Sequence, residues 1–411
     1  MAVVCLGLNH KTAPINIRER FALIETQVLA ALKALLDLPD INEAVILSTC
    51  NRTEIYIHTD NIKKGKDQLD SYLLLIHGIT AKHTDKHFYC LTEDGAIKHL
   101  FGVASGLDSM IIGEGQILGQ VKQAFEYSKR YGAKGDFLNK LFMHAIKTGK
   151  KVRHETEICR GASSISLAAV DIIKKRFKNL SELKILVIGA GKMGYQTTEF
   201  LCQSGVSSIF LANRSHHKAA QVAEKINGIP VKYEELVDTI KEVDIIISST
   251  SSPHFILTKD KIKAAHSLNN HRPLFIIDIA VPRDVDPEVK NLKNITLYNI
   301  DDLGRIVNDT LDMRGSEAEK AKNIINHEFL SFIHSVNIQK TVPLIQHLQN
   351  KYEDALSEAL CKVPEDKKEK FQKFGRNLIG KLLHSPIIKI KKLADDEEFR
   401  ETISYIKKIF D

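Results

Sequence analysis

The sequence predicts a multidomain α/β protein: a mixed α/β domain, then a domain built on a parallel sheet, then a helical domain. Three observations support this prediction. Between residues 160 and 300, short apolar runs alternate with helical stretches, which is typical of a parallel sheet covered by helices. One such run, Lys184–Ile188, ends in a glycine-rich turn. After residue 303, β-rich runs are few and apolar residues follow helical spacing. We expect the domains to cover residues 1–155, 160–302 and 303–411.

The N-terminal segment contains patterns of both strands and helices. Short runs rich in β-formers predict strands at Val3–Leu8, Glu43–Leu47 and Thr53–His58. Apolar residues at helical spacing predict a helix over Thr26–Leu38. Only a few polar residues separate the second strand from the third. Cys50 should therefore lie on the turn between them.

A glycine-rich loop follows the first strand of the predicted parallel sheet. Further strands are expected at Ile209–Ala212, Asp244–Ser248 and Leu274–Ile279. A G-x-G-x-x-G that closes a strand and opens a helix lets backbone amides approach a pyrophosphate at the positive end of that helix. An ordinary glycine-rich turn is the alternative. The loop predicts a Rossmann-like nucleotide site at Gly189, Ala190, Gly191, Lys192, Met193 and Gly194.

The next strand ends in Asn213, Arg214 and Ser215, where an NAD site usually carries an acidic residue for the ribose 2′-hydroxyl. An arginine fork can pair two phosphate oxygens, so it suits the 2′-phosphate of NADP. NADPH is therefore the predicted cofactor. A solvated Arg214 without a binding role is the alternative.

The C-terminal segment is predicted to be helical. Two stretches should follow a first amphipathic helix, with Pro343, Pro364 and Pro386 punctuating them. Between Cys361 and Lys392, ten Lys/Arg stand against three Asp/Glu. This excess favours either a surface for nucleic-acid phosphates or an ordinary solvated helix face. The first helix is indicated by Ala318, Ala321, Ile325, Phe329, Phe332, Ile333 and Val336.

Composition limits the class of protein. With 43% apolar and 27% charged residues and a net charge of +7, the chain is ordinary for a globular protein and permits a polyanionic partner. Its six cysteines show neither disulfide-framework nor zinc-ligand spacing, so we expect a reducing compartment and no metal. No apolar stretch reaches the ~18 residues that span a membrane, and the N-terminus lacks a signal-peptide pattern. We expect a cytoplasmic protein.

Cys50 is a candidate nucleophile. A thiolate is the reactive form of cysteine, and a nearby cation lowers a thiol's pKa. Arg52, two residues away, could act in this way or bind a substrate carboxylate. The local pattern by itself also fits a buried structural cysteine.

Several long motifs in a fixed order favour the nucleophile. They are GLNHKTAP (7–14), STCNRTEIY (48–56), GLDSMIIGEGQILGQVKQA (106–124), GAGKMG (189–194), ANRS (212–215) and DIAVPRDVDPEV (278–289). With them the chain resembles the glutamyl-tRNA reductase family nearly from end to end. Gly115 replaces a proline of the family pattern, and Lys192 replaces a commonly acidic residue. Neither position carries chemistry in the family.

The resemblance implies the roles of the site residues. Cys50 is the nucleophile, and His99 matches a histidine close to the reacting ester. Sequence alone would make His99 a satisfied histidine in a helix. The glutamyl group is expected to contact Thr49, Asn51 and Arg52, with Arg52 on its carboxylate. The same pocket is expected to include Ser109, Glu114, Gly115, Gln116 and Gln120.

The resemblance also implies the reaction. The Cys50 thiolate attacks the ester between glutamate and the tRNA ribose, and His99 orients or protonates the leaving group. Hydride from NADPH then reduces the thioester to glutamate 1-semialdehyde, which begins tetrapyrrole (5-aminolevulinate, porphyrin, heme) biosynthesis by the five-carbon pathway. Implied partners are glutamyl-tRNA(Glu), a second copy of the chain in a homodimer, and, transiently, glutamate-1-semialdehyde aminomutase.

Two other interpretations stay open at this level. A shikimate dehydrogenase-like NADP oxidoreductase would share the order of the first two domains and the Asn-Arg-Ser strand end. It would not need the cysteine of the STCNR motif or a helical third domain. A non-enzymatic tRNA-binding protein would keep the nucleotide fold without its chemistry. It would not need Cys50, Arg52 or His99.

Overall fold

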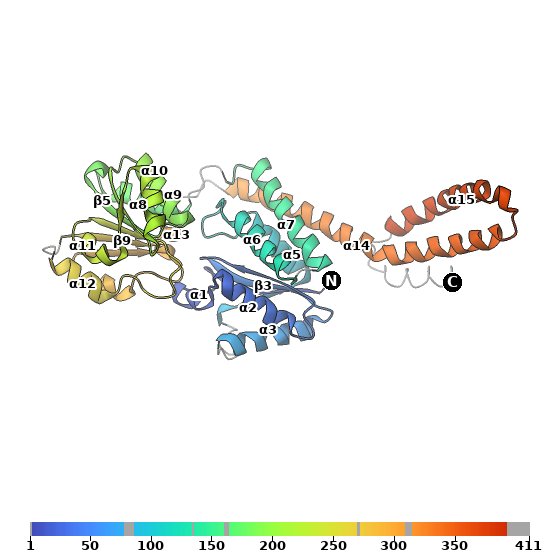
Figure 1. Cartoon of the computed structure of the whole chain (residues 1–411), viewed down its shortest axis with the longest axis horizontal. Coiled ribbons are helices and arrows are strands. Elements are labelled where there is room, and N and C mark those ends of the chain that lie inside the picture. Colours follow the sequence, from blue (N-terminus) through green and yellow to red (C-terminus); the bar gives the residue numbers. More distant parts are fainter. Residues whose placement is uncertain are drawn as a thin grey trace. The chain divides into compact units, whose positions relative to one another are not determined.

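The chain forms two compact units, Met1–Ile325 and Asn326–Asp411. The first unit contains one antiparallel and one parallel sheet, and the second is helical (Figure 1). The computed structural model describes residues 2–77, 86–133, 135–159, 164–268, 272–308 and 315–392.

The first sheet is antiparallel, with the strand order β2–β3–β1–β4. The sequence predicts three of its strands to within one residue but does not predict β4, whose four residues are only partly buried. The four strands are Val3–Asn9 (β1), Glu43–Ser48 (β2), Arg52–His58 (β3) and Tyr89–Thr92 (β4).

Helices cover both faces of this sheet (Figure 1). Because alternate residues of a strand point to opposite faces, Ile55 and Ile57 of β3 pack toward α2 and α3. Tyr56, between them, meets the ring of Phe142 on α7 edge-on, with the ring centroids 5.5 Å apart. The helices are Ile15–Phe21 (α1), Glu25–Leu36 (α2), Ile62–His77 (α3), Glu93–Ala104 (α5), Ile117–Arg130 (α6) and Asp136–Glu155 (α7).

The second sheet is parallel, with the strand order β10–β9–β8–β5–β6–β7. The chain runs outward from β5 to β7 and then continues on the other side of β5. This doubly wound order reverses between β5 and β8, where dinucleotides bind beyond the carboxyl ends of the strands. The strands are Lys184–Ile188 (β5), Ser208–Ala212 (β6), Ile229–Val231 (β7), Ile245–Ser248 (β8), Leu274–Asp278 (β9) and Ile295–Asn299 (β10).

The sequence predicts the four inner strands of the parallel sheet to within one residue, but it does not predict β7 and β10. Both are edge strands and are only partly buried. An edge strand needs no continuous apolar run, and β7 even contains Pro230, which is tolerated at an edge.

Two apolar clusters, one on each face, hold the parallel sheet. Ile185 and Val187 of β5 belong to the cluster that includes α8, α9, α10 and α13. Leu186 and Ile188, which alternate with them, belong to the cluster with α11 and α12. The expected boundary between residues 302 and 303 lies inside α13, where Leu303 is buried in the first cluster. The helices are Ile165–Arg176 (α8), Lys192–Gln203 (α9), His216–Ile226 (α10), Leu236–Ile240 (α11), Lys259–Leu268 (α12) and Ile300–Asn308 (α13).

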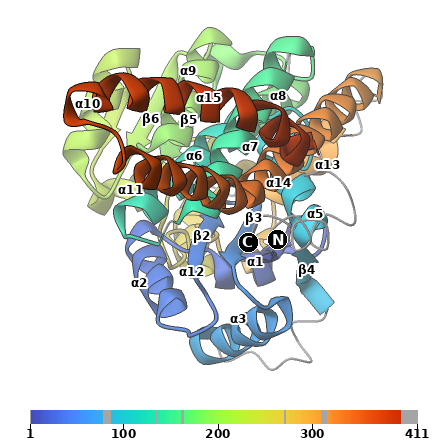
Figure 2. The same cartoon turned by 90° about the vertical axis from the view of Figure 1, so that its right-hand side faces the viewer.

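In the second unit, α15 (Glu365–Lys392) lies alongside the C-terminal half of α14 (Gly315–Leu360), as Figure 2 shows. The expectation that Pro343 and Pro386 punctuate helices is wrong, because both lie inside them, and only Pro364 lies between two helices. An internal proline costs about 3 kcal/mol. Packing offsets this cost, since Leu344 and Leu348 are buried against α15. No helix of the described residues is long and apolar enough to cross a membrane.

Candidate active site

Cys50 lies in the tight turn between β2 and β3, as the sequence predicts. Thr49 closes this turn. Its backbone N–H donates to the carbonyl of Arg52 at 2.8 Å, and its hydroxyl accepts from the backbone N–H groups of Asn51 and Arg52, both at 3.2 Å. The turn therefore fixes the backbone on both sides of the thiol.

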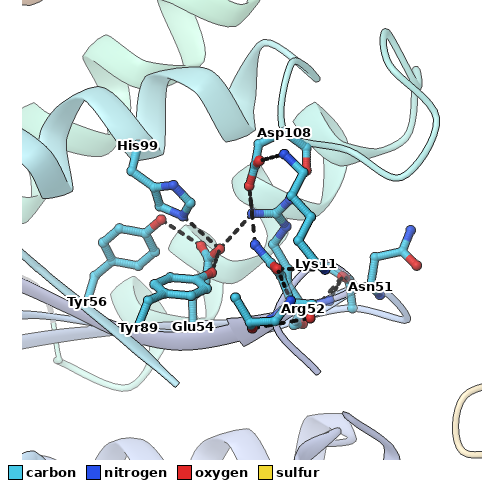
Figure 3. Close-up of polar contacts among 11 residues, drawn as sticks. Lys11, Asn51, Arg52, Glu54, Tyr56, Tyr89, His99 and Asp108 are labelled. Carbon is cyan, nitrogen blue, oxygen red and sulfur yellow. Dashed lines mark hydrogen bonds and ion pairs between the residues drawn. The ribbon is translucent and has the colours of Figure 1, made fainter. Parts of the chain in front are cut away.

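Arg52 is held by two carboxylates (Figure 3). Its guanidinium is 1% exposed, and Nη1 donates to Glu54 at 2.6 Å and to Asp108 at 3.1 Å. Nη2 donates to the carbonyl oxygen of Asp108, and Lys11 also pairs with the Asp108 carboxylate. The positive charge of Arg52 is thus balanced before any ligand is present.

Glu54 is the centre of this network (Figure 3). Its carboxylate is completely buried and accepts from Tyr56 and Tyr89 at 2.6 Å and from His99 Nε2 at 2.9 Å. Burial acts to raise the pKa of Glu54, but Arg52 and His99 outweigh it and hold that pKa well below its usual range. Because a carboxylate only accepts hydrogen bonds, His99 carries a proton on Nε2, the nitrogen that faces Glu54.

Our sequence interpretation missed Glu54. The signal was present, since a strand places alternate residues on one face. Arg52, Glu54 and Tyr56 follow this spacing along β3, and all three are buried. Three polar side chains on one buried face of a strand are unusual and indicate a functional network.

One group of potential metal ligands occurs among the described residues. The ligand atoms of Cys5, Glu54 and His99 lie within 4.8 Å of one another. A cation is disfavoured there because Arg52 already neutralises Glu54. Burial and then the charge of Glu54 also raise the pKa of Cys5 well above its usual range, which keeps this thiol protonated.

The Cys50 thiol is not activated in this structure. Burial and then the carboxylate of Glu114 raise its pKa to about 12, while Arg18 and Arg52 act in the opposite direction. Of the two roles considered for Arg52, lowering the pKa of Cys50 is present in direction, but the effect of burial is larger. The reason is that half-buried Cys50 packs against the apolar cluster of the parallel sheet, which disfavours a charge.

The loop before α6 contains four of the expected pocket residues. Gly113 has a φ of +83°, and a Cβ there would lie 2.0 Å from the carbonyl oxygen of Ile158, so only glycine fits. Arg153 of α7 donates to the carbonyls of Gly115 at 2.9 Å and Glu114 at 3.3 Å. Burial raises the pKa of Glu114. The loop is thus fixed through its backbone.

Gln116 and Gln120, also expected in the pocket, have other surroundings. Gln116 donates through Nε2 to Gln196 of α9 at 2.8 Å, so it contacts the parallel-sheet part of the first unit. Gln120 lines a cavity of about 210 Å³ together with Ser48, the residue before Thr49.

Three expected substrate contacts carry buried polar atoms without a partner among the described residues. They are Asn51 Oδ1, Arg52 Nε and Ser109 Oγ. His10 Nδ1, which our sequence interpretation missed, is a fourth. Burial and then the charge of Arg52 lower the pKa of His10 to about 4, so its ring is neutral. Because buried polar groups normally find partners, these atoms fit a polar ligand beside Cys50.

The glycine loop lies beside the end of β6. Gly189 has a φ of +108°, and a Cβ on Gly194 would lie 1.9 Å from the carbonyl oxygen of Gly189, so both positions need glycine. Gly191 precedes the first turn of α9, formed by Lys192 and Met193, and a Cβ on Gly191 would meet open space. This open helix N-terminus fits a pyrophosphate.

Asn213 and Arg214, which are neighbours at the end of β6, have different surroundings. Asn213 Oδ1 accepts from the backbone N–H of Ala190 at 3.3 Å, and its Nδ2 donates to the carbonyl of Ser215, so Asn213 ties β6 to the glycine loop. Arg214 is exposed, and no ion pair is recorded for it in the described part of the chain. Its guanidinium is therefore available for a phosphate.

Protein-family models match the chain in three consecutive segments. Residues 6–156 match the N-terminal domain of glutamyl-tRNA(Glu) reductase, and residues 320–411 match its dimerisation domain. Residues 171–306 match shikimate/quinate 5-dehydrogenase. The middle segment is accordingly similar to the nucleotide-binding domain of these dehydrogenases, which supports a nicotinamide cofactor.

Two curated relatives that match the whole chain are glutamyl-tRNA reductases. The glutamyl-tRNA reductase of Geotalea uraniireducens is 37% identical over 100% of this chain and 96% of its own length. That of Carboxydothermus hydrogenoformans is 40% identical over 100% and 93%. The solved glutamyl-tRNA reductase of Methanopyrus kandleri is 29% identical, covers 99% of this chain and 98% of its own, and has a TM-score of 0.51.

Proposed function

The chain belongs to the glutamyl-tRNA reductase family and is an oxidoreductase, and from this membership we propose that it reduces glutamyl-tRNA(Glu) to glutamate 1-semialdehyde, the first step of tetrapyrrole biosynthesis. The observation that carries the proposal is Cys50 on its rigid turn beside the unpartnered polar atoms of Asn51, Arg52 and Ser109. A shikimate dehydrogenase-like activity would leave the segment matched at residues 6–156 without a role.

In the first half-reaction, the sulfur of Cys50 forms a bond to the glutamyl carbonyl carbon and the bond to the ribose oxygen breaks. Burial raises the pKa of the Cys50 thiol to about 12, so its proton is lost as the sulfur attacks, and one proton goes to the departing ribose oxygen, which balances the step. His99 is proposed to help protonate the departing ribose oxygen, with Glu54 holding its ring in one tautomer. Arg52 Nε and Asn51 Oδ1 are proposed to orient the glutamyl group.

The second half-reaction needs a reductant, and we propose NADPH. Bound to Gly189–Gly194, NADPH supplies a hydride. Open space at Gly191 suits the pyrophosphate, and the exposed guanidinium of Arg214 suits the 2′-phosphate. On the protein side, the C–S bond to Cys50 breaks as the aldehyde forms, and a proton restores the thiol.

The proposed assembly is a homodimer that acts on tRNA. The segment matched to the dimerisation domain includes α15, which exposes an apolar stripe. The basic excess between Cys361 and Lys392 could contact tRNA phosphates. We also propose a cytoplasmic location and, since the aldehyde product is reactive, a transient contact with glutamate-1-semialdehyde aminomutase. The free thiols of Cys5, Cys50, Cys90, Cys202 and Cys361 suit a reducing compartment.

The test uses Cys50→Ser with glutamyl-tRNA and NADPH. Loss of the nucleophile should lower semialdehyde formation by a factor on the order of 10³ or more, because an unactivated hydroxyl reacts far more slowly than a thiolate. Without NADPH, mass spectrometry should find a glutamyl adduct on Cys50 of the wild-type chain and no adduct at position 50 of Cys50→Ser. Cys90→Ser, at an exposed thiol outside the site, is the control. Near-normal turnover by Cys50→Ser would contradict the mechanism.

A further inference from the structure

Helix α1 contacts both parts of the proposed active site. Its first residue, Ile15, is buried in the apolar cluster of the parallel sheet, and Cys50 packs against the same cluster. The segment before α1 contacts the Cys50 turn, because the backbone N–H of His10 donates to the carbonyl of Asn51 at 2.9 Å. Movement of α1 would therefore change the position of the Cys50 turn relative to the cofactor-binding part.

Arg18 of α1 uses its whole guanidinium, although its side chain is only 2% exposed. Nε donates to the carbonyl of Ala13 at 3.1 Å, and Nη1 donates to the carbonyl of Cys50 itself at 2.6 Å. Nη2 forms an ion pair with Asp301 on α13, the helix that follows β10 of the parallel sheet. One side chain thus joins the backbone of the nucleophile to the cofactor-binding part.

A second ion pair of opposite polarity lies next to the first. Glu19 accepts from Arg283 Nη2 at 2.7 Å and Nε at 3.0 Å, and from its backbone N–H at 3.2 Å. Arg283 lies in the segment that follows β9. Each charged residue of α1 is attracted by its own partner and would be repelled by the partner of the other pair, since the two pairs have opposite polarity. The two pairs therefore favour a single register of docking.

We propose that Arg18 is a positioning residue, and that the pairs Arg18–Asp301 and Glu19–Arg283 form a latch that must be closed for hydride transfer but not for thioester formation. This inference rests on the proposed function. Hydride transfer requires the thioester carbon at near-contact distance from a donor bound to another part of the chain. Thioester formation requires only the thiol and the tRNA ester, which meet at the Cys50 turn.

The two half-reactions can be measured separately. Thioester formation is followed without NADPH, as tRNA deacylation and as the Cys50 adduct, and semialdehyde formation is followed with NADPH. Asp301→Asn keeps the shape of the side chain and removes its charge. It should leave thioester formation within about twofold of wild type and lower semialdehyde formation about tenfold, with more free glutamate released by water. Asp301→Glu restores the charge and should recover most of the loss.

Arg18→Lys should be more severe, since an ammonium group cannot make all three contacts of the guanidinium. Loss of the donor to the Cys50 carbonyl should slow thioester formation several-fold in addition to the loss of reduction. Arg20→Lys, at an exposed arginine of the same helix, is the control and should match wild type. Thermal unfolding confirms that each variant is folded.

The ratio of the rates of thioester formation and semialdehyde formation tests the latch. A merely structural role for the latch predicts that Asp301→Asn lowers both halves equally, and such a result would overturn the inference. No loss in either half would overturn it as well. A wild-type chain that forms neither thioester nor semialdehyde would contradict the proposed function itself, which separates the two failures.

Discussion

At the scale of single residues, polar contacts at the active site converge on Glu54. Its carboxylate accepts from Arg52, Tyr56, Tyr89 and His99 in a completely buried position. Such a carboxylate is stabilised only as long as its donors are present, because an unpaired buried charge costs several kcal/mol. Glu54 is therefore a structural support for the two residues expected to act on the substrate, Arg52 and His99.

Glu54→Gln should lower the free energy of unfolding at pH 7 by about 3 kcal/mol or more, because it leaves buried Arg52 with one carboxylate fewer. The folded-state pKa of Glu54 is lowered, so its contribution is present above the ordinary carboxyl pKa of about 4.3. This contribution is lost as the pH falls further toward the lowered folded-state value. Urea unfolding at several pH values should show that the free energy of unfolding falls more steeply with decreasing pH in wild type than in Glu54→Gln.

A matched control for this prediction is Glu126→Gln. Glu126 is an exposed carboxylate that pairs with Lys129 one turn along α6. Exposed pairs of this kind are worth well under 1 kcal/mol, so the variant should unfold like wild type. Equal stabilities of Glu54→Gln and Glu126→Gln would show that the buried network contributes no net stability.

At the scale of elements, the proposed cofactor site is built by two adjacent strand–helix pairs, β5–α9 and β6–α10. Gly189 and Gly194 allow the close approach of loop and helix, and Asn213 at the end of β6 holds the loop through the Ala190 N–H. Arg214, between β6 and α10, is left exposed. The hydrogen bond of Asn213 and the exposure of Arg214 explain why these adjacent residues are expected to have different roles.

Arg214→Ala should weaken NADPH binding about 10- to 100-fold and leave NADH binding nearly unchanged, since only NADPH has a 2′-phosphate for the guanidinium to pair. Fluorescence titration with each cofactor measures both affinities. Lys184→Ala, at the exposed start of β5 and so at the opposite end of this strand from the glycine loop, removes an equal charge and serves as the control. Parallel losses for the two cofactors would mean that Arg214 does not distinguish them.

At the scale of the whole molecule, α15 has two apolar faces. Leu383 and Ile390 are buried against α14. A second stripe, at three-and-four spacing, stays exposed: Phe371 (50%), Phe374 (65%), Leu378 (46%) and Leu382 (58%). A contiguous exposed apolar stripe on a helix is typical of an interface between proteins. Because the segment matches a dimerisation domain, we propose this stripe as the surface that binds a second copy.

Phe374→Asp should dissociate the dimer. In a two-fold symmetric interface each substitution acts twice, so loss of one buried phenylalanine per chain should raise the dissociation constant on the order of 100-fold or more. Sedimentation over a range of concentrations measures this shift. Asn377→Asp adds the same charge at an exposed polar position of α15 and should leave the dimer intact. An unchanged dissociation constant for Phe374→Asp would place the interface elsewhere.

Local patterns in the sequence determined the strands with continuous apolar runs, the Cys50 turn and the glycine loop, because backbone periodicity and glycine geometry act within a few residues. The family motifs gave the chemistry expected at Cys50 and His99. The division at residues 155, 160 and 302, and the substrate roles of the pocket residues, stay predictions.

Tertiary structure decided what depends on residues far apart in the chain. Burial against the parallel-sheet cluster sets the high pKa of Cys50 and overrides the neighbouring Arg52. Packing against α15 stabilises α14 as a helix that continues past Pro343. Glu54 becomes a centre only because β4 and α5 bring Tyr89 and His99 to it. Each of these features depends on desolvation or on a contact between distant segments, and a local sequence pattern predicts neither.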